Sequence, residues 1–180
     1  IRLSLVGSEM CIRDSSYIGR IQNDPDDRRR GLLDAVRSRF PNHVMGQRWP
    51  ADMARTYAQS KIVINATVHN HLNRRVFEAL ASGALLITDN ADGLTDLFEE
   101  GIHFVLYRDD SELCGLIQHY LDDEAAREQI ARQGQEFVLE HHTYEQRMKQ
   151  LLNCVFEATG RTEHHQAESR YQDGGYYSSP

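Results

Sequence analysis

Short apolar runs of strand type alternate with helix-like segments along the middle of this 180-residue chain. The predicted strands are residues 17–21, 43–46, 61–67, 84–88 and 103–107. The predicted helices between the first four strands are residues 25–40, 51–60 and 73–82, and residues 93–98 continue the pattern. Two strands joined by a helix need a crossover connection, and crossovers join parallel strands. The alternation therefore predicts an α/β fold with a Rossmann-like parallel sheet and helices on both faces.

Capping signals support several of these helices. Pro25 suits a first helical position, and Asn73 is a good N-cap. Two more helices, residues 110–121 and 124–140, are expected after the last strand. Thr143 and Gln146 have the spacing of a capping box, which predicts a final helix from Tyr144. Its apolar residues fall on one stripe: Met148, Leu151, Leu152, Val155 and Phe156.

The two ends of the chain differ from its middle. Residues 1–14, IRLSLVGSEMCIRD, resemble a leader that recurs on unrelated proteins translated from sequence assemblies, where it comes from adaptor sequence. They are excluded from the fold as a fusion scar would be, and the true N-terminal portion is expected to be missing. Residues 159–180 lack an apolar period, which predicts a disordered tail in which His164 and His165 are solvated. The predicted domain spans residues 15–158.

Charge and composition exclude several classes of function. The net charge is −7 at pH 7, so no basic surface for nucleic acid is expected. No apolar run approaches the roughly 20 residues that span a bilayer, which predicts a soluble protein without a transmembrane segment. Cys11, Cys114 and Cys154 lie far apart and lack C-x-x-C spacing, which argues against a disulfide framework and a zinc site. A reducing cytoplasm is the favoured location.

Ligands of an open parallel sheet collect beyond the carboxyl ends of its strands. One such place, the loop 67–73, lies before a helix that points its free N–H groups and partial positive charge at the loop, which suits phosphate. Glu78 lies one and a half turns further along, where a carboxylate cannot help to bind phosphate. It can accept hydrogen bonds from neutral hydroxyls such as those of a ribose. Phosphate at the helix end and sugar at Glu78 together predict a nucleotide site.

A simpler interpretation stays open on spacing alone. Glu78 has Arg74 at i−4 and Arg75 at i−3, and a solvated intrahelical pair worth about a few tenths of a kcal/mol needs no ligand. Residues 28–30 are three arginines, and a charge run of this kind is typical of a solvated helix face.

A longer series of motifs resembles a known family. The matching positions are Asn73-x-Arg75-x-Phe77-Glu78-Ala79, Ala81-Ser82-Gly83-Ala84, Thr88-Asp89, Gly93-Leu94, Leu97-Phe98, Gly101, Tyr107, Asp109, Glu112-Leu113, residues 131–134, His142-Thr143-Tyr144 and Arg147. In these positions the chain resembles the C-terminal, donor-binding domain of group 1 glycosyltransferases with the GT-B fold, and more narrowly their spore-maturation-protein-like branch. Upstream, Gly19-Arg20 and Arg30-Gly31 resemble the start of the same domain, with Arg30 where lysine is usual.

The resemblance implies roles for two residues that face the donor sugar. Glu78 corresponds to the second glutamate of the family's E-x7-E signature, which holds the donor ribose. The first glutamate, which contacts the transferred sugar, falls at Asn70 in this chain. The chain therefore departs from the wider family at Asn70, while its match at Glu78 favours a ribose ligand over a surface pair.

The resemblance also implies a site for the donor diphosphate. His71, Leu72 and Asn73 occupy the loop whose backbone N–H groups meet the diphosphate, and Arg20 corresponds to an arginine that pairs with it. Arg75 matches the narrower branch, with no role assigned. Catalytic residues are not identified, because the family's acceptor site and catalytic base lie on an N-terminal domain.

These matches predict a glycosyltransferase of the hexosyl-transferring, metal-independent type, with a nucleotide-diphospho-sugar as substrate and no cofactor. Fixed N–H donors, a helix end and arginine stabilise the charge of the leaving diphosphate, so no metal ion and no D-x-D metal site are expected. The chain alone is expected to be inactive without its own N-terminal domain. One alternative is a non-catalytic structural or partner-binding module of the same origin, marked by Asn70. A receiver or NAD-binding domain is disfavoured, because no G-x-G-x-x-G motif follows a strand.

Overall fold

A computed structural model of the chain describes residues 11–19, 28–67 and 70–159. The chain divides into two compact units, Ile1–His142 and Thr143–Pro180.

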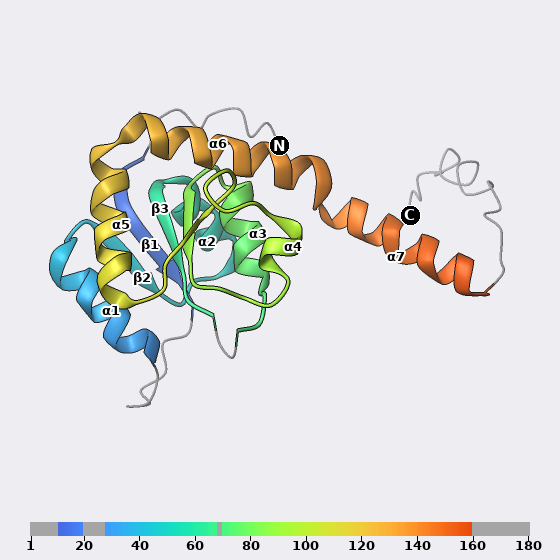
Figure 1. Cartoon of the computed structure of the whole chain (residues 1–180), viewed down its shortest axis with the longest axis horizontal. Coiled ribbons are helices and arrows are strands. Elements are labelled where there is room, and N and C mark those ends of the chain that lie inside the picture. The colour runs from blue at the N-terminus through green and yellow to red at the C-terminus, as the bar shows by residue number, and fades with distance from the viewer. Residues whose placement is uncertain (1–10, 20–27, 68–69, 160–180) are drawn as a thin grey trace, which may run out of the picture. The chain divides into compact units, whose positions relative to one another are not determined.

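The first unit is built on a five-stranded sheet in the order β2-β1-β3-β4-β5 (Figure 1). The strands are β1 (Arg13–Ile18), β2 (His43–Gly46), β3 (Ser60–Asn65), β4 (Leu85–Thr88) and β5 (Val105–Leu106). All four pairings between neighbouring strands are parallel. The predicted Rossmann-like α/β sheet is therefore confirmed, and the carboxyl ends of all its strands meet at one edge.

Helices cover both faces of this sheet. They are α1 (Arg28–Arg39), α2 (Pro50–Ala58), α3 (Arg74–Ala81), α4 (Leu94–Leu97), α5 (Asp110–Asp122) and α6 (Glu124–His141). Figure 1 shows α1 and α5 on one side of the strands and α3 and α4 on the other. One apolar cluster joins α1 and α5 to the sheet, and a second joins α2, α3 and α4 to it. Strand β3 alternates between them, because Ile62 and Ile64 belong to the first cluster and Val63 to the second.

The structure corrects two strand boundaries. Strand β1 begins at Arg13 and ends at Ile18, so it includes two residues of the segment 1–14 that we excluded from the fold. Arg13 donates a hydrogen bond to Gln59 Oε1 at 2.7 Å, and Asp14 lies 3.2 Å from the ammonium of Lys61. The prediction was wrong there because these polar residues form the half-buried start of a strand whose last four residues are buried. Strand β5 is shorter than predicted and contains only Val105 and Leu106.

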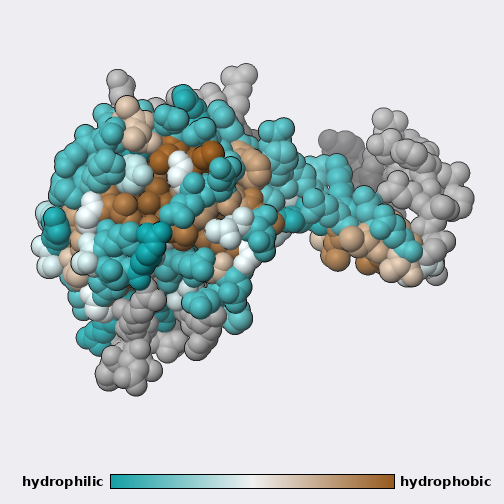
Figure 2. Space-filling model, in the orientation of Figure 1, coloured by the Kyte–Doolittle hydropathy of each residue, from teal (hydrophilic) through white to brown (hydrophobic). Residues whose placement is uncertain are grey.

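The second unit contains α7 (Tyr144–Thr159). Its predicted capping box is confirmed, because the Thr143 N–H donates to Gln146 Oε1 at 2.7 Å and the Gln146 N–H donates to Thr143 Oγ1 at 3.3 Å. Four apolar side chains of the predicted stripe are about half exposed, and Figure 2 shows them as a brown band along the helix: Met148, Leu151, Leu152 and Val155. The predicted disordered tail, with His164 and His165, lies outside the described residues from 160 onward. Of the helices in the described part of the chain, none has the length and apolar character to cross a membrane.

Candidate functional site

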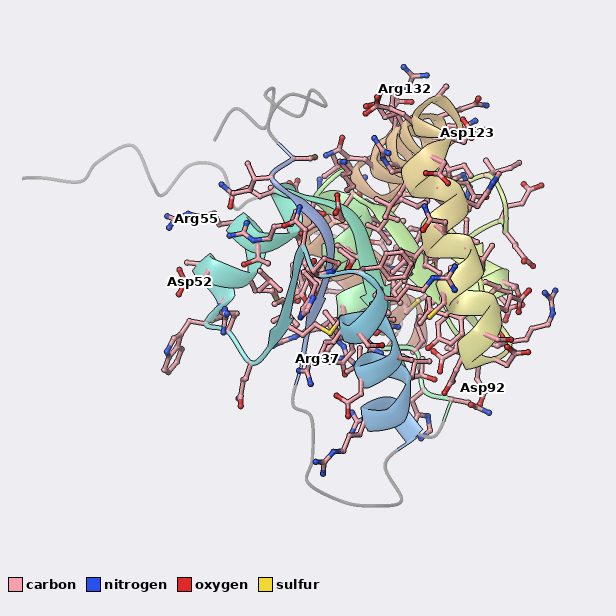
Figure 3. The ribbon with its side chains drawn as sticks, turned by 90° about the vertical axis from the view of Figure 1, so that its left-hand side faces the viewer. Arg37, Asp52, Arg55, Asp92, Asp123 and Arg132 are labelled. Carbon is pink, nitrogen blue, oxygen red and sulfur yellow. The ribbon has the colours of Figure 1, made fainter. Side chains whose placement is uncertain are left out.

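The loops after β3 and β4 meet at the edge formed by the carboxyl ends of the strands. A parallel bridge pairs His71 with Asp92, and the Asp92 N–H donates to the carbonyl of Asn70 at 2.7 Å. Figure 3 places Asp92 at this lower edge and Asp123 and Arg132 at the opposite one. The candidate residues Asn70 to Asn73 are thus held at the edge where ligands of parallel sheets bind.

The N-terminus of α3 is fixed by a chain of amide and hydroxyl groups. Asn73 Oδ1 accepts from the Arg75 N–H at 3.0 Å, which confirms Asn73 as the N-cap. The Asn73 amide donates to Asn65 Oδ1 at 3.4 Å, and the buried Asn65 donates to Thr88 Oγ1 at 3.0 Å. Because Asn65 and Thr88 end β3 and β4, the helix end is held in a fixed position relative to the sheet.

Asn70 has a left-handed backbone conformation, with φ of 56°. Asparagine tolerates this region better than most residues, so the conformation itself accounts for an amide here. The exposed Asn70 side chain lines a cavity of about 540 Å³ together with Asn90, Thr95 and Arg108. This lining supplies amide, hydroxyl and guanidinium groups, all of which can bind sugar hydroxyls.

Asp89 is a buried carboxylate beside the same cavity, and no role for it was predicted from the sequence. Its Oδ1 accepts from the Thr67 N–H at 2.9 Å, and its Oδ2 accepts from the Thr67 hydroxyl at 3.0 Å. Asp89 therefore fixes the start of the loop that follows β3. The sequence signal was the polar pair Thr88-Asp89 directly after an apolar strand.

His71 and Leu72 occupy the loop between Asn70 and the N-cap. His71 is exposed, whereas Leu72 is half-buried and packs against the cluster under α3. The apolar contact of Leu72 therefore holds the loop whose backbone was predicted to meet a diphosphate. Arg20, the fourth residue of that prediction, lies outside the described residues.

Glu78 forms only part of the surface pair that its spacing suggested. Its Oε1 lies 3.4 Å from Nε of Arg74, an arginine whose side chain is 73% exposed. Its Oε2 is shielded from solvent and has no hydrogen-bond partner in the described part of the chain. Burial raises the pKa of the Glu78 carboxyl, and Arg74 and then Arg75 oppose that rise. A buried acceptor without a hydrogen-bond partner lowers the stability of a fold by about 1–3 kcal/mol. A solvated ion pair with Arg74 does not explain why Oε2 of Glu78 is buried without a partner in the described part of the chain.

Arg75 forms no ion pair with Glu78 in the described part of the chain and instead hydrogen-bonds to three other segments. Its Nη1 donates to the hydroxyl of Tyr17 at 2.9 Å, and its Nη2 donates to the carbonyl of Ala66 at 3.2 Å. Its Nε donates to Asn73 Oδ1 at 3.3 Å. The simpler interpretation of a trio of Arg74, Arg75 and Glu78 is therefore wrong for Arg75.

Tyr57 of α2 is a further buried group beside these residues. Its hydroxyl donates to the carbonyl of Ile18 at 3.5 Å. Burial raises the pKa of Tyr57, Arg75 lowers it and Glu78 raises it further. Tyr57, Arg75 and Glu78 thus lie close enough to interact electrostatically. A tyrosine within the apolar pattern of a helix is typical of a core residue. Nothing in the sequence therefore indicated that Tyr57 lies near Arg75 and Glu78.

The described residues offer no group of three or more histidine, cysteine, aspartate or glutamate side chains placed to hold a metal ion. Cys11, Cys114 and Cys154 are free thiols.

Comparisons with known proteins identify the family. A family model described as glycosyl transferase-like matches residues 28–153. The fold is similar to that of Anabaena Alr3699/HepE in complex with UDP-glucose, with a TM-score of 0.66 and 16% identity over 79% of this chain and 48% of that one. It is also similar to the C-terminal domain of a group 1 glycosyl transferase, LpcC from Francisella tularensis, with a TM-score of 0.56 and 16% identity over 72% of this chain and 86% of that one.

A third similar structure is sucrose-phosphate synthase from Thermosynechococcus elongatus, with a TM-score of 0.59 and 20% identity over 80% of this chain and 38% of that one. The chain spans about half of HepE, 48% of its length. No curated protein sequence matches the chain. Since the family model covers most of its length, the chain belongs to the glycosyl transferase-like family, as a glycosyltransferase-like domain whose Rossmann-like fold matches GT-B glycosyltransferase domains.

Proposed function

We propose that this domain binds a nucleoside-diphosphate sugar as the donor half of a metal-independent hexosyltransferase. Glu78 accepts hydrogen bonds from the donor ribose. The backbone of His71, Leu72 and Asn73 meets the diphosphate, with Arg20 as its counter-charge. The observation that carries the proposal is Oε2 of Glu78, a shielded acceptor without a partner in the described part of the chain.

The charges around α3 support this division of roles. The helix N-terminus carries partial positive charge and free N–H groups, which attract phosphate. Glu78 lies a turn and a half deeper, where its negative charge repels phosphate and attracts the hydroxyls of a neutral sugar ring. Ionised Glu78 is therefore suited to the ribose, and the loop before α3 is suited to the diphosphate.

The donor sugar belongs at the Asn70 end of the loop. Asn70 lines the cavity beyond β4 and β5, whose amide and hydroxyl lining suits sugar hydroxyls. HepE, a similar structure, contains UDP-glucose, which supports a nucleotide-sugar donor for this chain too. Asn70, with the Asn73-x-Arg75-x-Phe77-Glu78 motif, also supports the spore-maturation-protein-like branch. We also propose a cytoplasmic location, which the free thiols of Cys11, Cys114 and Cys154 support.

Transfer of the sugar needs an acceptor and a catalytic base, which we assign to a second domain that faces Asn70. This chain spans 48% of HepE, a length that leaves room for such a domain in the whole protein. The leaving diphosphate is stabilised by N–H donors, the helix end and arginine, so the mechanism needs no metal ion.

Calorimetric titration of the folded protein with UDP, GDP and ADP tests the donor site. We expect one of the three to bind, and Glu78→Gln to weaken that binding about tenfold, because the amide supplies one acceptor where the carboxylate supplies two. The matched control is Glu145→Gln, which removes another glutamate paired at i,i+4, with Lys149 at 2.8 Å. The proposal fails if none of the three nucleotides binds, or if both variants bind as the wild type does.

Asn70 supports a second candidate, a non-catalytic module that keeps the fold. An amide stands where the wider family has the glutamate that contacts the transferred sugar. This candidate predicts a folded protein that binds none of the three diphosphates. The same titration therefore separates the two functions.

A further inference from the structure

Arg75 joins three segments that come from different parts of the chain. Its guanidinium donates to Tyr17 at the end of β1, to Ala66 after β3 and to Asn73 at the N-cap of α3, over distances of 2.9–3.3 Å. Its Cζ also lies 5.3 Å from the centroid of the Tyr17 ring, which adds a cation–π contact. One side chain thus sets the separation between the end of β1 and the N-terminus of α3.

Gly19 makes room for this guanidinium. A Cβ at position 19 would overlap Nη1 of Arg75 and would lie 2.9 Å from the Tyr17 hydroxyl oxygen. A side chain at position 19 would therefore displace the Arg75 guanidinium or the Tyr17 hydroxyl from this contact. This close approach gives a physical reason for the glycine of the Gly19-Arg20 pair.

The groups that accept hydrogen bonds from Arg75 carry no charge. The hydroxyl, the carbonyl and the amide oxygen that it contacts are all neutral, and within the described residues it takes part in no ion pair. The adjacent Arg74 pairs instead with Glu78. The half-buried Arg75 charge therefore adds to the partial positive charge at the N-terminus of α3, which leaves a local excess of positive charge.

We propose that Arg75 is the positioning residue for the donor diphosphate. It holds the end of β1 and the exit of β3 at a fixed distance from the N-terminus of α3, and its charge favours an anion between them. The inference rests on the proposed donor site, and it gives a role to the arginine for which neither spacing nor resemblance supplied one. A purely structural role, as a cross-link that only stabilises the fold, is the competing explanation.

The test compares a nucleoside diphosphate with its nucleoside. The probes are whichever of UDP, GDP and ADP binds the wild-type protein, and the corresponding uridine, guanosine or adenosine. For Arg75→Met we expect the diphosphate affinity to fall about tenfold or more and the nucleoside affinity to change less than about twofold, because only the diphosphate senses the lost charge. Added salt should shrink the difference between wild type and variant.

Two further variants complete the test. Arg75→Lys restores the charge but cannot reach three acceptors, so it should recover only part of the diphosphate affinity. The control is Arg55→Met, which removes an arginine that points away from the sheet in Figure 3 and should leave both affinities unchanged. If Arg75→Met does not fold, Tyr17→Phe carries the test, because it removes one acceptor with little change of shape.

The outcomes separate the inference from the function on which it rests. Equal losses for diphosphate and nucleoside would show a structural cross-link and overturn the inference. Wild-type affinity in Arg75→Met, or in Tyr17→Phe where it stands in, would overturn it as well. A wild-type protein that binds none of the three diphosphates would overturn the proposed function and the inference together.

Discussion

Two glutamates of this domain have the same sequence relation to an arginine but different surroundings. Glu78 follows Arg74 by four residues in α3, and Glu112 follows Arg108 by four residues at the start of α5. The side chains of the two glutamates are similarly exposed, at 26% and 32%. Spacing and exposure therefore do not distinguish a paired surface residue from a candidate ligand.

The second oxygen of each carboxylate distinguishes them. Glu112 uses both oxygens, because Oε1 lies 2.9 Å from Nη1 of Arg108 and Oε2 accepts from the Arg108 N–H at 2.6 Å. Glu78 has one oxygen near Arg74, while its Oε2 is buried and has no partner in the described part of the chain. A glutamate that is fully satisfied within the protein stabilises the fold, whereas one with an unused acceptor has capacity for a ligand.

The largest expected difference between the two glutamates is in nucleotide affinity. Replacing Glu78 with methionine removes both ribose acceptors, so we expect Glu78→Met to weaken nucleoside-diphosphate binding by about tenfold to a hundredfold. Glu112→Met should change it less than about twofold. Calorimetry on both variants makes the comparison, and equal affinities would remove the distinction between the two residues.

The second-largest expected effect is on stability, and here replacing Glu112 should matter more than replacing Glu78. Glu112→Met loses a charge-assisted hydrogen bond to a backbone N–H and an ion pair, so we expect it to lower the free energy of unfolding by about 1–2 kcal/mol. Glu78→Met removes a buried acceptor that has no partner, so it should be neutral or stabilise the protein by up to about 1 kcal/mol. Urea unfolding without nucleotide measures both. A larger loss of stability at Glu78 than at Glu112 would contradict the interpretation of Oε2.

The fold was predictable from the sequence because strand and helix patterns alternate and have different periods. Asn73 as N-cap and the capping box of Thr143 and Gln146 were predictable too, because both depend on neighbours within three residues. The start of β1 was not, because its first residues are polar and only their pairing across the sheet shows that they belong to a strand.

The site was predictable only as far as local spacing reaches. The position of Glu78 behind a helix end follows from the sequence. Its unused oxygen and the contact of Arg75 with Tyr17, 58 residues away, depend on how distant segments pack. Arg74 and Arg75 are both arginines at similar spacing from Glu78. The three contacts of Arg75 distinguish it from Arg74.

A smaller effect is the dependence of stability on pH. Burial raises the pKa of Glu78 in the folded protein above its usual value of 4.5, so the folded state binds this proton more tightly than the unfolded state does. Glu78 therefore favours folding below its unfolded pKa, and this contribution is lost as the pH rises through its folded pKa. Relative to Glu78→Gln, the wild type should lose stability from about pH 4 upward, measured by urea unfolding at several pH values. A difference between the two proteins that does not change with pH would show that the carboxyl is not perturbed.

The smallest expected effect comes from Arg74, which has the same relation to Glu78 as Arg108 has to Glu112. Arg74 is 73% exposed and its Nε lies 3.4 Å from Oε1 of Glu78, so solvent screens the pair. We expect Arg74→Met to lower the free energy of unfolding by only about 0.2–0.5 kcal/mol and to leave nucleotide affinity within about twofold of the wild type. Urea unfolding and calorimetry test both values. A loss of affinity as large as that of Glu78→Met would mean that the pair acts as one unit, and that Arg74 orients the carboxylate for the ribose although solvent surrounds it.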